Sequence, residues 1–133
     1  MVILALLLTA IFFILSVIHI YWALGGEAGL AAAIPVKENG QQSFSPSRTG
    51  TLAVAVVLFF FAVLVFCVGV QNITVLRPLC WLLALVLFLR AIGDFKLIGL
   101  FKRPSASVFA KYDTWLYSPL CLFLAAGVLY ISL

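Results

Sequence analysis

The feature that most limits how this chain can fold is a set of four apolar stretches, each long enough to cross a bilayer. A transmembrane helix needs about 20 apolar residues, because an α-helix rises about 1.5 Å per residue. The stretches lie at about residues 2–22, 51–70, 78–94 and 114–133. Segments of this length cross hydrocarbon as helices, which pair their backbone groups internally. The sequence therefore predicts an all-α membrane protein, an antiparallel bundle of four transmembrane helices.

The composition excludes an ordinary soluble domain. Of the 133 residues, 66% are hydrophobic and only 9% are charged, whereas soluble domains carry about 25% charged residues. We expect residues 1–133 to form a single transmembrane domain. The first stretch lacks a basic leading region and exceeds the apolar core of a signal peptide, so we expect it to be retained as a helix.

The Lys and Arg residues between the stretches indicate orientation. The loop at about 23–50 contains Lys37 and Arg48, and the loop at about 95–113 contains Lys96, Lys102, Arg103 and Lys111. On the opposite side of the membrane, only Arg77 is basic. Because short cytoplasmic loops carry an excess of Lys and Arg, we expect both longer loops in the cytoplasm and both termini outside. Basic residues at that surface also attract anionic lipids.

Small residues recur at a spacing of seven along every stretch. They are Thr9, Ser16 and Ala23; Ala55, Ala62 and Gly69; Ala84 and Ala91; and Ser118, Ala125 and Ser132. This spacing keeps them on one helix face, where small side chains let membrane helices approach closely. The pattern predicts a compact bundle with Phe and Leu side chains facing lipid.

The three cysteines form no CxxC motif and have no metal-ligand spacing, so no metal site is predicted. Cys67 and Cys80 fall near the same membrane face across a short turn, where a disulfide is geometrically conceivable. Cys121 is expected in the core.

Alternating topology gathers most polar side chains into one layer at the cytoplasmic ends of the helices. The layer contains His19, Tyr21, Trp22, Arg90, Asp94, Asp113, Tyr117 and Ser118, with Glu27 just outside it. Ionisable groups at membrane depth usually face the bundle and mark function. No such groups continue into the opposite half, so a single protomer is a poor candidate for an ion channel.

Each member of this layer also has a structural interpretation. Arg90 and Asp94 are spaced to pair on one helix face, and Asp113 is placed to cap the fourth helix, although Ser118-Pro119 offers a competing start. His19 can bond a neighbouring helix. The Tyr and Trp residues are typical of an interface belt.

Four segments together resemble a family of small bacterial four-helix membrane proteins of unknown function. They are "HIYWALGG", "AAAIP", "LRAIGDFKLIGLFKR" and "FAKYDTWLYSPLC", and the resemblance covers nearly the whole chain. It implies four helices and the bacterial inner membrane, but no activity. The matching positions are His19, Tyr21, Trp22, Gly25, Gly26, Arg90, Gly93, Asp94, Asp113, Tyr117, Ser118 and Pro119.

The favoured hypothesis is a one-sided, cytoplasm-facing polar pocket that binds an amphipathic or lipid-like ligand. Its candidate binding residues are His19, Tyr21, Trp22, Glu27, Arg90, Asp94, Asp113 and Tyr117. Membrane lipids and an amphipathic small molecule are the expected partners, nucleic acid is not, and no cofactor is indicated.

Two alternatives stay open. One is an interfacial membrane enzyme in which His19 and an Asp perform acid–base chemistry on a lipid-like substrate, since histidine changes charge near neutral pH. The other is a small accessory subunit or a homo-oligomeric transporter.

Overall fold

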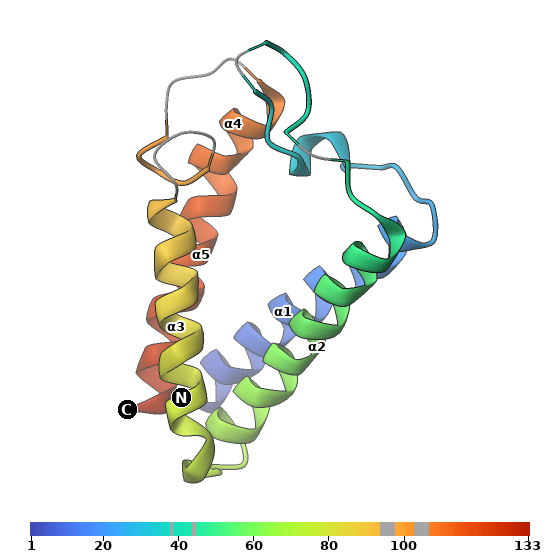
Figure 1. The fold of residues 1–133 in the computed structure, drawn as a ribbon. Helices are drawn as coiled ribbons and strands as arrows, with labels where there is room; N and C mark the ends of the chain where they lie inside the picture. The colour runs from blue at the N-terminus through green and yellow to red at the C-terminus, as the bar shows by residue number, and fades with distance from the viewer. Residues whose placement is uncertain (38, 44, 94–97, 103–106) are drawn as a thin grey trace.

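The structure, a computed structural model, describes residues 1–37, 39–43, 45–93, 98–102 and 107–133. The long helical segments are α1 (Val2–Ala23), α2 (Arg48–Gly69), α3 (Arg77–Ile92) and a last segment from Val108 to Ser132 (Figure 1). Short 3-10 turns η1 (Ala31–Ala33) and η2 (Thr74–Leu76) precede α2 and α3. Four helical segments are long and apolar enough to span a membrane. The predicted four-helix membrane architecture is confirmed.

The helix ends differ by a few residues from the predicted bounds. Helix α2 begins three residues early because the Ser47 side chain caps it, accepting a hydrogen bond of 2.9 Å from the Gly50 N–H. Helix α3 ends at Ile92, where Gly93 takes a φ of +84° that favours glycine. Asp94, predicted at the end of this helix, lies outside the described residues.

The fourth segment begins at Val108 rather than at 114, so the predicted start is wrong. It comprises α4 (Val108–Tyr112), a π turn η3 (Asp113–Tyr117) and α5 (Ser118–Ser132), and the Ser107 side chain caps it. In the π turn, the Ser118 N–H donates to the Asp113 carbonyl, five residues back. A proline inside a helix lacks an N–H and crowds the preceding turn. The wider π turn accommodates Pro119, which the sequence pattern had suggested as a helix start.

Small residues make the close helix contacts. Of the set spaced by seven, every member except Thr9 is buried. The Ser16 hydroxyl donates to the Ala55 carbonyl across α1 and α2 at 2.7 Å. A Cβ added at Gly127 on α5 would lie 3.0 Å from the Leu8 side chain of α1. The predicted packing through small residues is confirmed.

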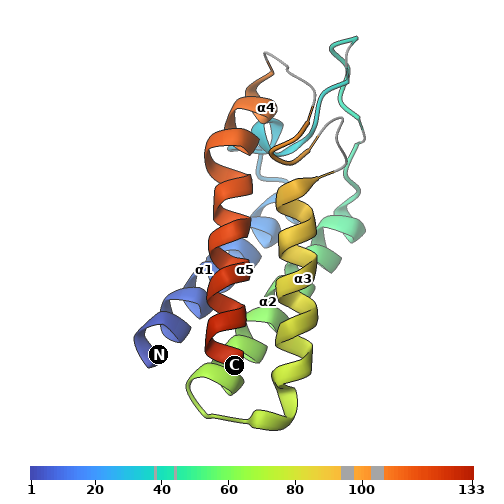
Figure 2. The ribbon, with the colours of Figure 1, turned by 90° about the vertical axis from the view of Figure 1, so that its left-hand side faces the viewer.

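The helices form two pairs, α1 with α2 and α3 with α5. The pairs meet near the end that carries both termini and diverge toward the long loops (Figures 1 and 2). The buried core, which includes Leu8, Phe12, Val65, Leu124 and Val128, belongs to this closed end. The compact packing expected along the whole bundle is therefore restricted to one half of it.

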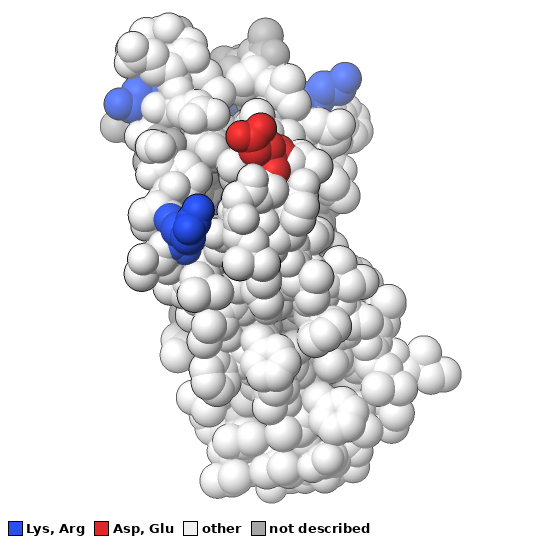
Figure 3. Space-filling model, turned by 90° about the vertical axis from the view of Figure 1, so that its right-hand side faces the viewer, with Lys and Arg blue, Asp and Glu red and all other residues white. Residues whose placement is uncertain are grey.

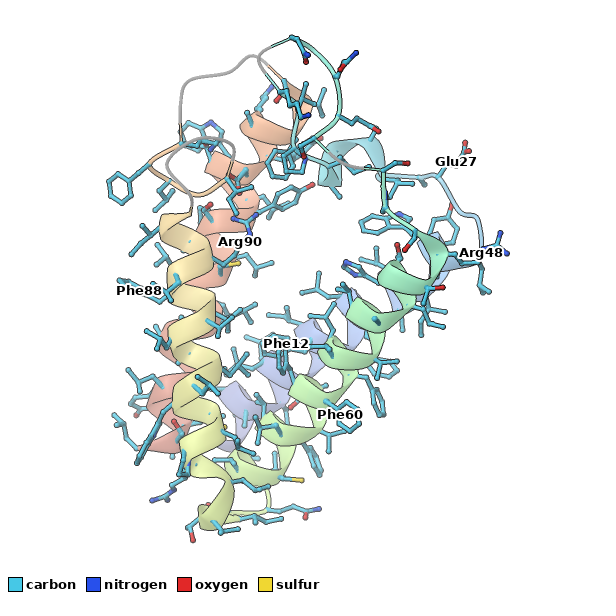
Figure 4. All side chains as sticks on the ribbon, viewed as in Figure 1. Phe12, Glu27, Arg48, Phe60, Phe88 and Arg90 are labelled. Carbon is cyan, nitrogen blue, oxygen red and sulfur yellow. The ribbon has the colours of Figure 1, made fainter. Side chains whose placement is uncertain are left out.

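The exterior is apolar except at the loop end. Phe60 and Phe88 point outward, whereas Phe12 points between the helix pairs and is 1% exposed (Figure 4). On the face drawn in Figure 3, the charged side chains gather at the loop end and none lies over the lower half. This distribution is the one expected for helices surrounded by lipid.

Candidate functional site

A buried carboxylate organises the loop end of the α3–α5 pair. Asp113, the first residue of the π turn η3, is fully buried. Its Oδ1 accepts hydrogen bonds from Arg90 Nη2 at 2.9 Å and from the Ser118 hydroxyl at 3.1 Å. Its Oδ2 accepts one from the Gly99 N–H at 2.7 Å and lies 3.2 Å from Lys102 Nζ. We refer to these five residues as the Asp113 cluster.

Two glycines bring the third loop back to this carboxylate. Gly93 and Gly99 have φ values of +84° and +88°, and their backbones lie against each other. A Cβ at Gly93 would overlap the Ile98 carbonyl, and one at Gly99 would overlap the Ile92 carbonyl. The Leu100 N–H donates to the Ala91 carbonyl at 2.8 Å. Gly99 thus lies against the end of α3, and its N–H donates to Asp113.

Lys102 is the second cation of the cluster. Its side chain is only 6% exposed. Besides Asp113, its ammonium group bonds the Gly99 carbonyl at 3.1 Å and the Thr114 hydroxyl. The cluster therefore contains two cations and one carboxylate, and carries one excess positive charge.

Arg90 is the member of the cluster that retains unused bonding capacity. It lies in the last turn of α3 and points toward the space between the helix pairs (Figure 4). Its side chain is 30% exposed. Nη2 pairs with Asp113, but Nη1 is buried and has no hydrogen-bond partner among the described residues. An unpaired buried donor is costly, and here it belongs to a charged group.

These contacts bear on two interpretations drawn from the sequence. The partner of Arg90 in the described structure is Asp113; the proposed partner Asp94 lies outside the described residues. Asp113 does not cap the fourth helix, since it lies within the helical segment that Ser107 caps. A carboxylate has about four lone-pair sites, and four donors already approach them. Asp113 is therefore poorly placed to act as a general base.

Tyr117 connects the cluster region to the first loop. Its hydroxyl donates to the Ala32 carbonyl at 2.9 Å, and its ring stacks on Tyr112 with centroids 6.2 Å apart. Ala32 belongs to η1, in the loop that crosses above the gap between the helix pairs (Figure 1). Tyr117 thus holds this loop to the α4–α5 segment.

The other predicted site residues lie on the α1–α2 pair. His19 Nδ1 is 2.7 Å from the Leu15 carbonyl, and its ring meets Trp22 edge to face. Trp22 Nε1 donates to the Ala28 carbonyl, and the Tyr21 ring lies over Gly26. Glu27 is exposed, on the far side of the gap from Arg90 (Figure 4).

The single polar layer predicted from the sequence is thus divided between the helix pairs. Arg90, Asp113 and Tyr117 lie together, and His19, Tyr21 and Trp22 form a second group. Among the described residues, His19 contacts no carboxylate, and no three metal-ligating side chains gather. Lys102 and Gly99 were missed as site residues because the loop reversal depends on long-range contacts. The Gly93–Gly99 spacing in "GDFKLIG" was the available signal.

A family model described as "Protein of unknown function (DUF3995)" matches residues 12–128 of the chain. No curated protein and no solved structure matches it.

Proposed function

This chain belongs to that family of unknown function, and we propose that it binds an anionic, amphipathic molecule at the loop end of α3. The observation that carries the proposal is Nη1 of Arg90, which has no hydrogen-bond partner in the described part of the chain and belongs to a cluster with one excess positive charge. An anionic oxygen bound to Nη1 would satisfy the buried donor and balance that charge. Arginine suits this role because its planar guanidinium binds phosphate or carboxylate with two parallel hydrogen bonds.

An amphipathic ligand is favoured over a fully soluble anion because of what surrounds Arg90. Apart from Arg77 at its first residue, α3 carries no other charged side chain. On the side of the helix that carries Arg90, the exposed apolar side chains include Val86 and Leu82, four and eight residues before it. A ligand whose charged group reaches Arg90 from the membrane would lay its apolar part along this face. Lipids and lipid-like metabolites have this shape.

The proposal includes a location and an orientation. The distribution of Lys and Arg supports an orientation with the Asp113 cluster toward the cytoplasm and both termini outside, and the family resemblance implies the bacterial inner membrane. Membrane lipids are then its constant partners. The accessory-subunit and oligomeric-transporter hypotheses stay predictions. The acid–base enzyme also stays a prediction; of the two aspartates proposed for it, Asp113 does not contact His19 and Asp94 lies outside the described residues.

The test compares two variants that each remove one positive charge from α3. Arg90→Gln removes the guanidinium but leaves Asp113 paired with Lys102. Arg77→Gln removes a guanidinium at the opposite end of the helix and serves as the control. Binding of dihexanoyl phosphatidylglycerol and of the zwitterionic dihexanoyl phosphatidylcholine is measured by titration calorimetry on the purified protein in detergent. Circular dichroism checks that both variants remain helical.

We expect the wild type to prefer the anionic lipid, and Arg90→Gln to weaken its binding by about tenfold or more, the value of one charge-assisted hydrogen bond. Arg77→Gln should bind like the wild type. Equal binding of the two lipids, or equal losses in the two variants, would contradict the proposal. If the wild type shows the expected preference, native mass spectrometry of protein extracted from its own host gives the mass of the natural ligand.

A further inference from the structure

A pocket that is separate from the Asp113 cluster lies between the loop-side end of α1, the start of α2 and the first loop. It measures about 380 Å³ and is lined by none of the cluster residues. Its walls are mainly apolar, with Trp22, Leu30, Pro46 and Val54 among them, and His19 contributes an ionisable ring. Pockets for small molecules have volumes of about 300–1,000 Å³ and combine apolar walls with a few polar groups.

The hydrogen bond of His19 determines which chemistry its ring offers to the pocket. Nδ1 lies 2.7 Å from the Leu15 carbonyl oxygen, which only accepts, so Nδ1 carries the hydrogen. In the neutral imidazole, Nε2 is then a bare acceptor. The edge-to-face contact with Trp22, at 5.0 Å between centroids, further fixes the ring.

Three hydroxyl side chains also line the pocket, Ser45, Ser47 and Thr51, and the last two are engaged with the backbone at the start of α2. The Ser47 hydroxyl accepts from the Gly50 N–H, and the Thr51 hydroxyl donates to the Ser47 carbonyl. Nε2 of His19 has no partner among the described residues. The pocket therefore presents a hydrogen-bond acceptor in mainly apolar surroundings.

We propose that this pocket binds an apolar molecule that carries one hydroxyl group. The hydroxyl donates to Nε2 of His19, and the apolar body packs among Trp22, Leu30 and Val54. His19 lies four residues before the end of α1, which is roughly 6 Å along the helix. This depth, just inside the interface, suits the hydroxyl of a membrane-dissolved alcohol rather than that of a water-soluble one.

The test uses Trp22 as a reporter of occupancy. The chain has three tryptophans, so Trp81→Phe with Trp115→Phe leaves only Trp22. A bromine-tagged undecanol, whose bromine quenches indole fluorescence, is titrated into this protein in detergent, alongside its methyl ether and bromoethanol. The ether keeps the size and apolarity of the alcohol but has no hydrogen to donate.

Two further variants separate the hydrogen bond from the cavity. His19→Phe keeps a ring beside Trp22 but removes the acceptor, and Ala33→Phe fills the pocket while leaving His19 in place. We expect saturable quenching by the long alcohol, about tenfold weaker binding of the ether, loss of this preference in His19→Phe and loss of saturation in Ala33→Phe.

The proposal is overturned by quenching that does not saturate, by equal binding of alcohol and ether, or by a preference that survives in His19→Phe. Equal binding of bromoethanol would assign the pocket to a water-soluble alcohol and overturn the lipid assignment.

Discussion

Replacing Asp113 by asparagine tests whether this carboxylate is the electrostatic centre of the loop end. The side chain keeps its size and an oxygen that can accept from the Gly99 N–H or the Ser118 hydroxyl. It loses the negative charge that lies between Arg90 and Lys102. The two cations then have no carboxylate partner within the part of the chain that the structure describes.

The structure allows the cost to be estimated. Removing one partner of a buried ion pair costs about 3–5 kcal/mol. Arg90 is 30% exposed and can turn toward water, which lowers the cost, whereas Lys102 is only 6% exposed and cannot. We therefore expect the free energy of unfolding to fall by about 3 kcal/mol, toward the lower end of that range. If Asp113 acted only as a helix cap, the same substitution would lower the free energy of unfolding by only about 1 kcal/mol.

The assay is reversible unfolding of the purified protein in mixed micelles, followed by circular dichroism. A second substitution, Lys102→Met, in the Asp113→Asn background should recover about 1 kcal/mol because it removes the stranded cation. Arg77→Gln, distant from the cluster, serves as the control. If Asp113→Asn stays within about 0.5 kcal/mol of the wild type, Asp113 is not the electrostatic centre of the loop end.

Two further predictions concern the loops. Gly99→Ala should destabilise the protein by about 3 kcal/mol and Gly40→Ala by about 1 kcal/mol, because both have positive φ but only Gly99 meets a backbone carbonyl. Thermal unfolding measures both, and equal costs would refute the close approach at Gly99. Tyr117→Phe should cost no more than about 1 kcal/mol yet speed amide exchange around Ala32, measured by mass spectrometry, because it removes the bond that ties the first loop to the last helical segment. Unchanged exchange there would mean that other contacts hold the loop.

The division of polar residues between the helix pairs has a consequence for function. The sequence suggested one pocket in which His19 and an aspartate act together. The structure places His19 in a mainly apolar pocket of the α1–α2 pair and Arg90 in a charged cluster of the α3–α5 pair. The proposals at these two places are accordingly independent, and each is tested by variants that leave the other site intact.

The sequence by itself determined the four spans and the residues that face inward. Whether a segment crosses the membrane depends on its own hydropathy and length, because lipid replaces the partner elements that a soluble core would require. The small residues spaced by seven were informative for a similar reason. Ser16, Ala55, Ala62 and Ala125 mark the helix faces that pack closely, and all four are buried.

Only the tertiary structure decided the pairing of helices and the composition of the cluster. Pro119 resembled a helix start, but the π turn places it inside a continuous helical segment and carries Asp113 into the interior. Lys102 and Gly99 reach Asp113 because two glycine backbones pack against each other at the end of α3. These outcomes depend on contacts between residues distant in the sequence, whose free energies no local pattern of hydropathy or charge encodes.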